Sequence, residues 1–208
     1  MRIAIEGNIG AGKSTVLRAF AGERVFAEPV DAWGSLLDRF YASPAEWGLA
    51  FSLRVLSSFD EPHTHERCIV ERCPLSCRHV FAQLLFNDGH LTQGEWDLFK
   101  DYFDVLGWAP DAMVYIDTPA HVCLERTRER GRPSEAGLDL QHLRRLEFQY
   151  DTLLKYSNVP VVRLDGTLPP DELARAALDA VAALRAATPA ASSHERESTP
   201  CTPSSTAA

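Results

Sequence analysis

A glycine-rich segment near the start of the chain restricts the possible folds more than any other feature. It reads GNIGAGKS over residues 7–14, and it follows the apolar run RIAIE at residues 2–6. The segment matches the full pattern GxxxxGK[ST], in which glycines let backbone N–H groups surround an anion at the N-terminus of a helix. The sequence therefore predicts a strand, a loop and a helix that together bind the phosphate chain of a nucleotide.

The positions of this loop have expected parts in binding a nucleotide. The Lys13 ammonium is expected to reach the β- and γ-phosphates, and the Ser14 hydroxyl suits a Mg²⁺ ligand. The predicted cofactors are therefore ATP, as the phosphate donor, and Mg²⁺. The residues of this segment predicted to bind the nucleotide are Gly7, Asn8, Ile9, Gly10, Ala11, Gly12, Lys13, Ser14 and Thr15.

Short β-type runs alternate with longer helical runs along the rest of the chain. The runs expected to be strands are Arg2–Glu6, Arg24–Ala27, Arg67–Glu71, Ala112–Ile116 and Val159–Leu164. The expected helices are Lys13–Ala21, Pro44–Phe59, Pro74–Phe86, Gln93–Leu106, Pro119–Glu129, Asp139–Ser157 and Pro169–Leu184. Because the strands are rich in β-branched residues without alternation, we expect an α/β fold with five parallel strands and helices on both faces.

Composition limits the number of domains and the classes of partner. The chain has 208 residues, of which 45% are hydrophobic and 24% charged, and this fits a single domain over residues 1–185. Residues 186–208 are rich in Ser, Thr, Pro and Ala, so we expect a disordered tail that is either dispensable or a target of phosphorylation. The net charge of −8 and the lack of Lys/Arg runs argue against nucleic acid as a partner.

Cysteine usage and hydropathy bear on the compartment. The five cysteines form no CxxC pair and no zinc-ligand spacing, which favours free thiols in a cytosol-like reducing compartment. The sequence shows no targeting presequence, and no apolar run reaches the roughly 18 residues of a membrane span. We therefore expect a cytoplasmic protein without a membrane partner.

Charged side chains follow two of the predicted strands. Glu28 follows the second strand, where it suits a base that accepts the proton of an attacking hydroxyl; an ordinary surface turn is the alternative. Glu71 and Arg72 follow the third strand, where they suit a Mg²⁺ ligand and a group that stabilises a moving phosphoryl; an exposed ion pair is the alternative. Ligands bind outside the carboxyl ends of the strands in such sheets, so these residues are candidates for catalysis.

A basic segment follows the fourth predicted strand. Arg126 and Arg130 are four residues apart and share one helical face, and Gly131 is expected to end that helix. Arg132 then opens a polar loop. A basic loop beside a phosphate site suits a short arginine-rich lid that closes over the triphosphate and excludes water, so all three arginines are predicted to contact phosphate. A solvated charged surface is the alternative interpretation.

Together, these motifs resemble the deoxynucleoside kinase family, and the resemblance covers residues 2–185 in order. The matching segments are IEGNIGAGKST at residues 5–15, EPV with a following tryptophan at residues 28–33, Y-x-x-P-x-x-W at residues 41–47, ER at residues 71–72 and the lid at residues 123–135. The resemblance implies an α/β fold of the P-loop kinase type, and phosphate transfer from ATP to the 5′-hydroxyl of a deoxynucleoside. It also implies a homodimer, the usual state of the cellular relatives.

The resemblance further implies roles at the matching positions. Glu28 is implied as the base on the 5′-hydroxyl, with Arg72 nearby. Tyr41 and Glu135 are implied to bind the sugar 3′-hydroxyl, and Phe81 is implied to stack on the base. The remaining residues implied to line the substrate pocket are Trp33, Leu37, Phe40, Phe51, Ser52 and Cys77. The segment Asp165–Pro169 falls where the family contacts the adenine of the donor.

Four positions depart from the family pattern. Cys73 replaces the serine of the family's ERS motif, which is a small change. Ser52 stands where the family usually has a glutamine that makes two hydrogen bonds to a pyrimidine edge. Phe59 and Cys77 stand at the positions of the arginine and aspartate of cytidine-preferring members. The pocket is therefore more apolar and suits the methyl group of thymine, so we expect thymidine or broad pyrimidine specificity.

Two other functions stay open on the sequence. A thymidylate-kinase-like nucleoside monophosphate kinase shares the P-loop and the lid, although the acidic segment at residues 28–31 favours an uncharged acceptor. A GTPase-like switch is suggested by DVLG at residues 104–107, which fits DxxG. That match lies inside a predicted helix, and the chain contains no NKxD guanine motif.

Overall fold

Five short strands form one parallel sheet in the computed structural model, which describes residues 1–187. The strands are β1 (Arg2–Gly7), β2 (Val25–Phe26), β3 (Cys68–Glu71), β4 (Ala112–Asp117) and β5 (Val161–Asp165). Their order in the sheet is β2-β3-β1-β4-β5, and every neighbouring pair is parallel. The predicted five-stranded parallel sheet is therefore confirmed.

The central strand β1 explains why the strand sequences do not alternate. Its residues Ile3 to Gly7 are all buried, and the side chains of β3 and most of those of β4 are buried as well. Parallel strands joined by helical crossovers are covered on both faces, so apolar residues occupy consecutive positions. Glu6 is the exception within β1, a fully buried carboxylate in an otherwise apolar strand.

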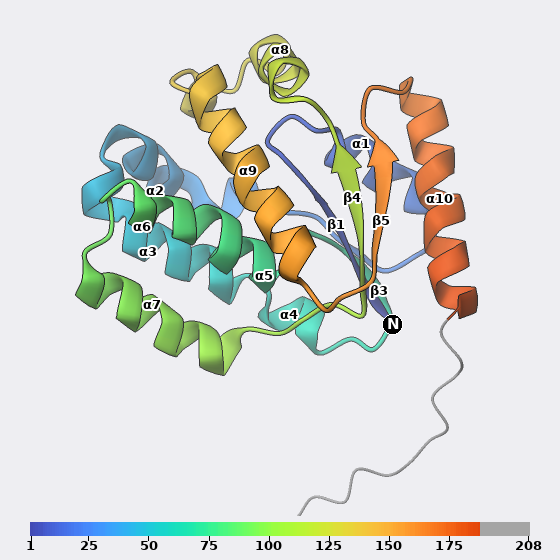
Figure 1. Ribbon diagram of the computed structural model, residues 1–208, viewed down its shortest axis with the longest axis horizontal. Coiled ribbons are helices and arrows are strands. Elements are labelled where there is room, and N and C mark those ends of the chain that lie inside the picture. Colours follow the sequence, from blue (N-terminus) through green and yellow to red (C-terminus); the bar gives the residue numbers. More distant parts are fainter. Residues whose placement is uncertain (188–208) are drawn as a thin grey trace, which may run out of the picture.

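Helices connect the strands and cover both faces of the sheet (Figure 1). The α-helices are α1 (Lys13–Leu17), α2 (Val30–Ala42), α3 (Pro44–Ser57), α4 (Asp60–His63), α5 (Pro74–Ser76), α6 (Gln83–Asn87), α7 (Gln93–Leu106), α8 (Ala120–Arg130), α9 (Leu140–Tyr156) and α10 (Pro170–Ala187). Two 3₁₀ turns, η1 (Arg18–Phe20) and η3 (Pro133–Glu135), and one π-helical turn, η2 (Cys77–Ala82), complete the list. Helices α1 and α10 pack together on one face, and α9 with η2 and α5 lies on the other.

The helical prediction differs from the structure at several places, one of which is α4 (Asp60–His63), a short helix beyond the predicted end of the helix Pro44–Phe59. No helix was predicted between Val30 and Ala42, yet α2 occupies this segment, with a kink at Gly34 that interrupts the helical periodicity. The predicted helix Pro74–Phe86 is three helical pieces around the π turn, and the predicted helix after the P-loop is α-helical only to Leu17. Packing against neighbouring elements sets such local windings, and periodicity alone does not reveal them.

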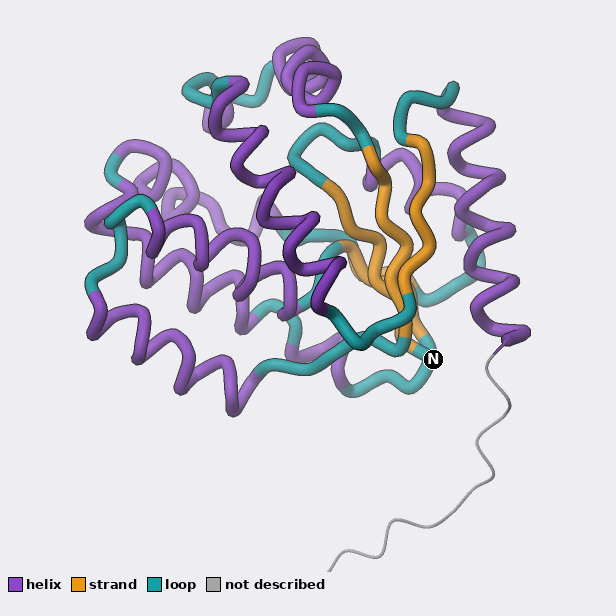
Figure 2. The backbone as a smooth tube through the Cα atoms, viewed as in Figure 1, coloured by secondary structure: helices purple, strands orange, loops and turns teal. Residues whose placement is uncertain are grey.

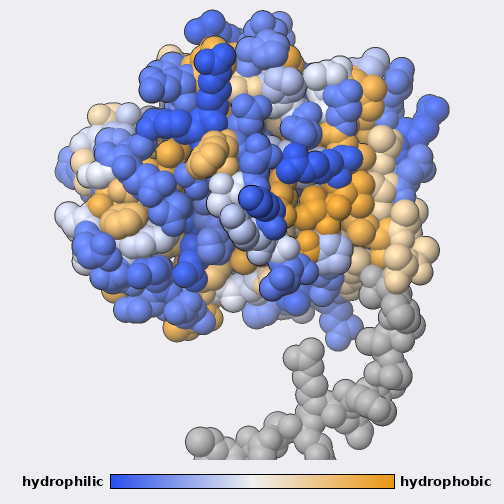
Figure 3. Space-filling view, in the orientation of Figure 1, coloured by the Kyte–Doolittle hydropathy of each residue, from blue (hydrophilic) through white to orange (hydrophobic). Residues whose placement is uncertain are grey.

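The face of the sheet between α9 and α10 is partly uncovered. Figure 3 shows apolar side chains in this region, over β4 and β5. The Arg163 guanidinium lies 5.4 Å from the Tyr115 ring centre on this face and pairs with Asp117 and Asp151. The Arg163 side chain and its two acidic partners therefore cover only part of this face, and apolar side chains stay exposed beside them.

The C-terminal helix passes the predicted end of the domain. Helix α10 extends to Ala187, two residues beyond the predicted boundary at residue 185, and the rest of the predicted tail lies outside the described residues. Within residues 1–187, no helix combines the length and the apolar composition needed to cross a bilayer.

Candidate active site

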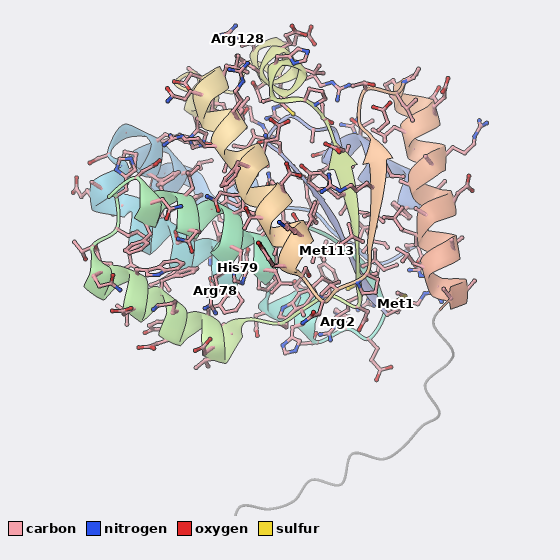
Figure 4. The ribbon with its side chains drawn as sticks, in the orientation of Figure 1. Met1, Arg2, Arg78, His79, Met113 and Arg128 are labelled. Carbon is pink, nitrogen blue, oxygen red and sulfur yellow. The ribbon has the colours of Figure 1, made fainter. Side chains whose placement is uncertain are left out.

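The loops that leave the strands meet at one edge of the sheet. In Figure 2 these loops lie along the upper edge, above the strands. Arg128, in α8, marks this edge in Figure 4, and Met1 and Arg2 mark the opposite edge. The residues that follow β1, β2 and β3 therefore converge, as the rule for parallel sheets predicts.

The loop after β1 is shaped by its own backbone and by Asn8. The Asn8 amide donates to the Leu143 carbonyl at 2.8 Å, and its Oδ1 accepts from the Ile9 N–H at 2.8 Å. The Lys13 ammonium crosses the loop and donates to the Asn8 carbonyl at 2.9 Å. Asn8 is buried, so its side chain supports the loop from beneath, and the backbone of the following residues faces outward.

Two glycines of the loop lie where no side chain fits. Gly10 has φ +80°, and a Cβ there would lie 2.4 Å from the Cys123 carbonyl oxygen of α8. Gly7 has φ +151°, and its Cβ would lie 2.9 Å from the Ile116 carbonyl of β4. These glycines are needed for close packing of the loop against α8 and β4 as well as for backbone freedom.

The Lys13 side chain is only 5% exposed, and this changes its acidity. Burial is the main cause that lowers the pKa of Lys13 to about 8; the charge of Arg72 acts in the same direction, and the nearby carboxylates Glu71, Glu28 and Glu6 oppose the shift. A phosphate chain beside the ammonium would favour its charged form. The position of Lys13 therefore favours a charged ammonium when an anion is bound beside it.

A chain of hydrogen bonds links the P-loop to the ends of β2 and β3. The Ser14 hydroxyl donates to Glu71 Oε1 at 3.3 Å, and the Glu28 backbone N–H donates to Glu71 Oε2 at 3.3 Å. A hydroxyl and a carboxylate side by side at a phosphate site are the oxygen donors that Mg²⁺ takes together with phosphate oxygens and water. The residues present therefore fit Mg²⁺, and the assignment of Ser14 and Glu71 to it stays a prediction.

Arg72 and Glu28 form the centre of the site. Arg72 Nε donates to Glu28 Oε1 at 3.0 Å, and the two side chains are 6% and 20% exposed. Arg72 is the only described non-glycine residue with positive φ, at +65°. Such a backbone conformation costs about 1–3 kcal/mol and persists where surrounding contacts enforce it, frequently at functional sites. The strained residue after β3 thus carries the guanidinium that holds Glu28.

Two connected cavities meet at this ion pair. The smaller one has a volume of about 400 Å³ and is lined by the P-loop, by Arg18 and by the three lid arginines. The larger one has a volume of about 730 Å³ and extends between α2, α3, η2 and α9. The residues that line both cavities are Ile9, Glu28, Trp33, Tyr41, Phe51, Arg72 and Phe81. A ligand in the larger cavity can therefore reach a phosphate chain in the smaller one beside Glu28.

Aromatic rings form the walls of the larger cavity. The rings of Phe40 and Phe51 are stacked with centres 4.6 Å apart, and the Trp33 ring meets Phe51 edge-on at 5.4 Å. On another wall, the Arg72 guanidinium carbon lies 4.6 Å from the centre of the Phe81 ring. Flat apolar walls suit a planar aromatic ligand such as a nucleobase.

The inner end of the larger cavity is weakly polar. Ser52, Phe59 and Cys77 line it and are buried, and the Cys77 thiol donates to the Ser52 carbonyl at 3.8 Å. Burial raises the pKa of the Cys77 thiol above its usual range, with the charge of Glu28 adding to the effect. Cys77 therefore stays a neutral thiol, and the Ser52 hydroxyl is the strongest polar group of these three side chains.

The lid contacts the phosphate cavity through several arginines. Arg126 donates to the Ala11 carbonyl at 3.3 Å. Arg130 and Arg132 both pair with Glu135, at 2.6 Å and 3.4 Å. Burial raises the pKa of Tyr41 to about 12, and the charge of Glu135 adds to this shift. Tyr41 and Glu135 thus face the same space between α2 and the lid.

Most of the predicted site residues lie together, with some exceptions. Leu37 and Glu135 line the phosphate cavity and not the larger cavity, although both were assigned to the substrate. Gly7, Asn8 and Ala11 line neither cavity, because they support the loop from beneath. The segment Asp165–Pro169, which the resemblance places at the adenine of the donor, also lines neither cavity. The remaining predicted residues line at least one cavity, and their individual roles stay predictions.

Sequence reasoning missed Glu6 and Tyr150, which lie directly behind Arg72. The Tyr150 hydroxyl donates to Glu6 Oε2 at 3.1 Å and accepts from Arg72 Nη1. A charged residue within the apolar run of β1 is a visible signal for Glu6. Tyr150 has no such signal, because it lies 78 residues after Arg72 in an ordinary amphipathic helix.

The chemistry of this arrangement is narrow. A carboxylate held by a guanidinium stands between an aromatic cavity and an anion-binding loop with several cations. It can accept a proton from a hydroxyl on a planar ligand while the surrounding cations stabilise a phosphoryl group. No described group of three or more His, Cys, Asp or Glu residues is placed to hold a metal ion by itself.

Comparison with known proteins agrees with this geometry. A sequence model of the deoxynucleoside kinase family matches residues 3–177. The chain is 32% identical to putative kinase protein 029R of Invertebrate iridescent virus 3, over 77% of this chain and 86% of the viral protein. It is 29% identical to deoxycytidine kinase 2 of Gallus gallus, over 74% of this chain and 73% of that protein.

A solved structure shares the fold. Deoxyadenosine kinase from M. mycoides with bound dCTP superposes with a TM-score of 0.80 at 20% identity, over 88% of this chain and 100% of that chain. The same P-loop kinase architecture is therefore present in both. From the family match and the viral relative together, the chain belongs to the deoxynucleoside kinase family.

Proposed function

We propose that this protein transfers the γ-phosphoryl group of ATP to the 5′-hydroxyl of a deoxynucleoside, with thymidine or pyrimidine deoxynucleosides in general as substrates. The observation that carries the proposal is the Glu28–Arg72 pair, 3.0 Å apart, at the junction of the aromatic cavity and the P-loop cavity. Membership of the deoxynucleoside kinase family supports the same reaction.

In the proposed reaction, Glu28 accepts the proton of the 5′-hydroxyl. The hydroxyl oxygen bonds to the γ-phosphorus, the bond from that phosphorus to the bridging oxygen breaks, and the products are a deoxynucleoside monophosphate and ADP. Lys13 and the lid residues Arg126 and Arg130 balance the charge of the transferred group, and Arg72 holds Glu28 beside the hydroxyl. Most of the rate enhancement then comes from positioning and electrostatics.

Mg²⁺ would be held by Ser14, with Glu71 binding it directly or through water. When bound, it would neutralise charge on the phosphate oxygens. The 3.3 Å contact between the Ser14 hydroxyl and the Glu71 carboxylate supports this assignment. Aromatic walls around the nucleoside and basic side chains around the triphosphate also explain how water is excluded from the reacting atoms.

The inner end of the larger cavity supports the proposed base preference. Phe59 and Cys77 offer no charge to the exocyclic amino group of cytosine, and Ser52 offers one hydroxyl. An apolar wall tolerates the methyl group of thymine. Relatives include deoxycytidine kinase 2 of Gallus gallus and mitochondrial thymidine kinase 2 of Homo sapiens, so the preference has to be measured.

The decisive experiment supplies the purified full chain with labelled ATP, Mg²⁺ and each of the four deoxynucleosides, with dTMP in parallel. Thymidine is expected to be phosphorylated, with deoxycytidine as a second substrate. Turnover of dTMP alone would show a nucleoside monophosphate kinase instead. Turnover restricted to purine deoxynucleosides would refute the proposed base preference and leave the reaction class intact.

Ser52→Gln tests how the base is recognised. A glutamine amide can make two hydrogen bonds to a pyrimidine edge where serine makes one, so kcat/KM for thymidine should rise by about 5- to 10-fold. Ser57→Gln, an exposed serine on the same helix and outside the cavity lining, is the matched control. An unchanged or lower value for Ser52→Gln would mean that the base is bound in another orientation.

The GTPase-like alternative has little structural support. Asp104, the first residue of the DxxG match, lies within α7, and its carboxylate pairs with Arg78 at 3.4 Å. Arg78 belongs to η2 and lines neither cavity of the site. The carboxylate of a nucleotide switch would have to lie at the P-loop.

We further propose a homodimer in a cytoplasmic, reducing compartment. Leu98, Tyr102, Val105 and Leu106 form an exposed apolar stripe on α7, and Val105 is 81% exposed. A stripe at this helical spacing suits a symmetric helix–helix contact. The four described cysteines are unpaired buried thiols, which supports the compartment.

A further inference from the structure

Glu6 is a buried acidic residue that has no role in the proposed reaction. Its side chain is fully buried in β1, the central strand of the sheet. One carboxylate oxygen, Oε2, accepts a hydrogen bond from the Tyr150 hydroxyl at 3.1 Å. The other, Oε1, lies within hydrogen-bonding distance of no described donor in suitable geometry, and the Cys73 thiol and the Ser76 hydroxyl are the polar groups beside the carboxyl group. A buried carboxylate with one unpaired oxygen reduces stability, so its presence calls for a reason beyond packing.

Tyr150 connects Glu6 to the reacting edge. Its hydroxyl accepts a hydrogen bond from Arg72 Nη1 while it donates to Glu6, and the ring lies 5.4 Å from that of Tyr115 and 6.3 Å from that of Phe81. The Tyr150 side chain is fully buried. A phenol that accepts from a cation and donates to an acid is polarised in both bonds, which strengthens each of them.

The Arg72 guanidinium is consequently held from several sides. Nη1 donates to Tyr150 and to the Gly7 carbonyl, the latter at 2.8 Å, and Nε donates to Glu28 at 3.0 Å. Of these contacts, only the one to Tyr150 comes from outside the strand-end loops. It attaches the guanidinium to α9 and, through Glu6, to the centre of the sheet.

We propose that Tyr150 and Glu6 are positioning residues, which fix the Arg72 guanidinium so that Glu28 and the transferred phosphoryl group are correctly oriented. The expected effect on kcat rests on the proposed function, whereas the fixed position of the guanidinium rests on the hydrogen-bond geometry alone. Two features support it beyond contact: the positive φ of Arg72, which surrounding contacts must enforce, and the use of a charged residue in a strand where an apolar one would pack.

The kinetic test is a double-mutant cycle between Tyr150→Phe and Arg72→Ala. Removing the hydroxyl should lower kcat by about 10- to 100-fold, with KM for the nucleoside and for ATP within about 3-fold, because the guanidinium moves while the cavities keep their shape. In the Arg72→Ala background the same change should alter the residual rate by less than about 2-fold, because a residue that acts through Arg72 has nothing left to position.

Three control variants separate positioning from stability. Tyr115→Phe removes the hydroxyl of the neighbouring buried tyrosine and should leave kcat within about 2-fold, because the ring that packs against Tyr150 is kept and the lost hydroxyl makes no hydrogen bond to Tyr150, Glu6 or Arg72. Glu6→Gln keeps an oxygen acceptor for Tyr150 and should retain more activity than Glu6→Leu, which removes it. Equal loss of rate from Tyr150→Phe in both Arg72 backgrounds, or equal loss from Tyr115→Phe, would overturn the inference.

A measurement without turnover keeps the inference separate from the proposed function. In ¹H–¹⁵N spectra of the free protein, the Arg72 Nε–H signal, assigned by its loss in Arg72→Lys, should exchange slowly with water. It should exchange at least about 10-fold faster in Tyr150→Phe than in Tyr115→Phe, because opening of the guanidinium becomes easier. Equal exchange in the two variants would refute the positioning role of Tyr150 even if the enzyme phosphorylated nucleosides. Slow exchange in a protein that phosphorylates no nucleoside would refute the proposed function alone.

Discussion

Glu28 reaches the reacting edge from a strand of only two residues, and Arg72 supplies the contact that fixes it there. Because β2 is so short, the backbone around Glu28 has few ladder hydrogen bonds of its own. Its carboxylate bond to Arg72 and its N–H bond to Glu71 replace them. At the scale of residues, the site is therefore a cluster of mutually dependent charges.

Glu28→Gln removes the proposed base and keeps the size of the side chain. We expect kcat to fall by about 10²- to 10⁴-fold, the usual effect of losing general-base catalysis, with a small change in KM for the nucleoside. Steady-state kinetics with thymidine and ATP test this, and far-ultraviolet circular dichroism checks the fold. Asp31→Asn, which removes a nearby exposed carboxylate outside both cavities, is the control. Full activity of Glu28→Gln would show that another group accepts the proton.

Lys13 gives the site a pH dependence with a defined sign. Burial lowers its pKa in the free protein from 10.5 to about 8, so the ammonium loses its proton as pH rises through 8. The affinity for ATP should therefore fall between pH 7.5 and 9.5, a range in which phosphate, with a second pKa of about 6, keeps its charge. Lys13→Arg should remove this dependence, since arginine stays charged. Equilibrium ATP binding across this range measures both proteins, and an equal slope for both would contradict the assignment.

The same lowered pKa also affects folding. An unfolded Lys13 keeps its proton up to about 10.5, whereas the folded one releases it near 8. Between these two values the unfolded state binds more protons, so Lys13 by itself makes the folded state more stable as pH rises from 8 to 10.5. At neutral pH the buried Lys13 ammonium therefore lowers the stability of the folded protein, and this cost is expected at a site whose positive charge binds an anionic ligand.

At the scale of elements, the P-loop depends on its fit against α8 and β4 as much as on its own glycines. The Thr118 hydroxyl and the Arg126 guanidinium both donate to the Ala11 carbonyl, and Gly10 touches the backbone of α8. The loop, the end of β4 and the start of the lid helix thus form one packed unit. Movement of the lid and occupation of the loop are expected to be coupled through these contacts.

Gly10→Ala and Gly22→Ala separate the two reasons for glycine. Both positions have positive φ, at +80° and +97°, but a Cβ at Gly22 meets nothing within 4 Å, whereas at Gly10 it lies 2.4 Å from a carbonyl. Gly22→Ala should lower the free energy of unfolding by about 1–2 kcal/mol from backbone strain alone. Gly10→Ala should lower it by about 1–3 kcal/mol more and raise KM for ATP. Urea unfolding and ATP kinetics measure the pair; equal effects would mean that the loop moves aside freely.

At the scale of the whole molecule, the exposed stripe on α7 determines the expected assembly. In solution the full chain is expected to form a dimer, with twice the monomer mass of 23.1 kDa. The Val105→Glu variant should be a monomer, because dimerisation would bury its charge in an apolar contact. Light scattering after size exclusion measures this. Leu178→Glu, which adds the same charge at an exposed leucine of α10, should leave the mass unchanged. A single mass for the unmodified chain would refute the homodimer.

The sequence by itself determined the local features of the fold and of the site. The glycine pattern identified the loop at residues 7–14, and apolar runs located all five strands and their parallel arrangement. Glu71, at the end of the third strand, and Glu28 and Arg72, just after the second and third strands, were identified by the rule that ligands bind at the carboxyl ends of strands. These features depend on short segments, in which consecutive residues determine the backbone preference and the burial pattern.

Only the tertiary structure decided which distant residues meet. Helix α2 was not predicted, because Gly34 breaks its periodicity, yet it carries Trp33, Phe40 and Tyr41 to the cavity wall. The π turn at η2 is likewise set by packing and not by propensity. Tyr150 reaches Arg72 across 78 residues of chain, since α9 lies over the end of β1. Such contacts depend on how the layers pack, and the residue pattern of one segment does not predict which other segment will pack against it.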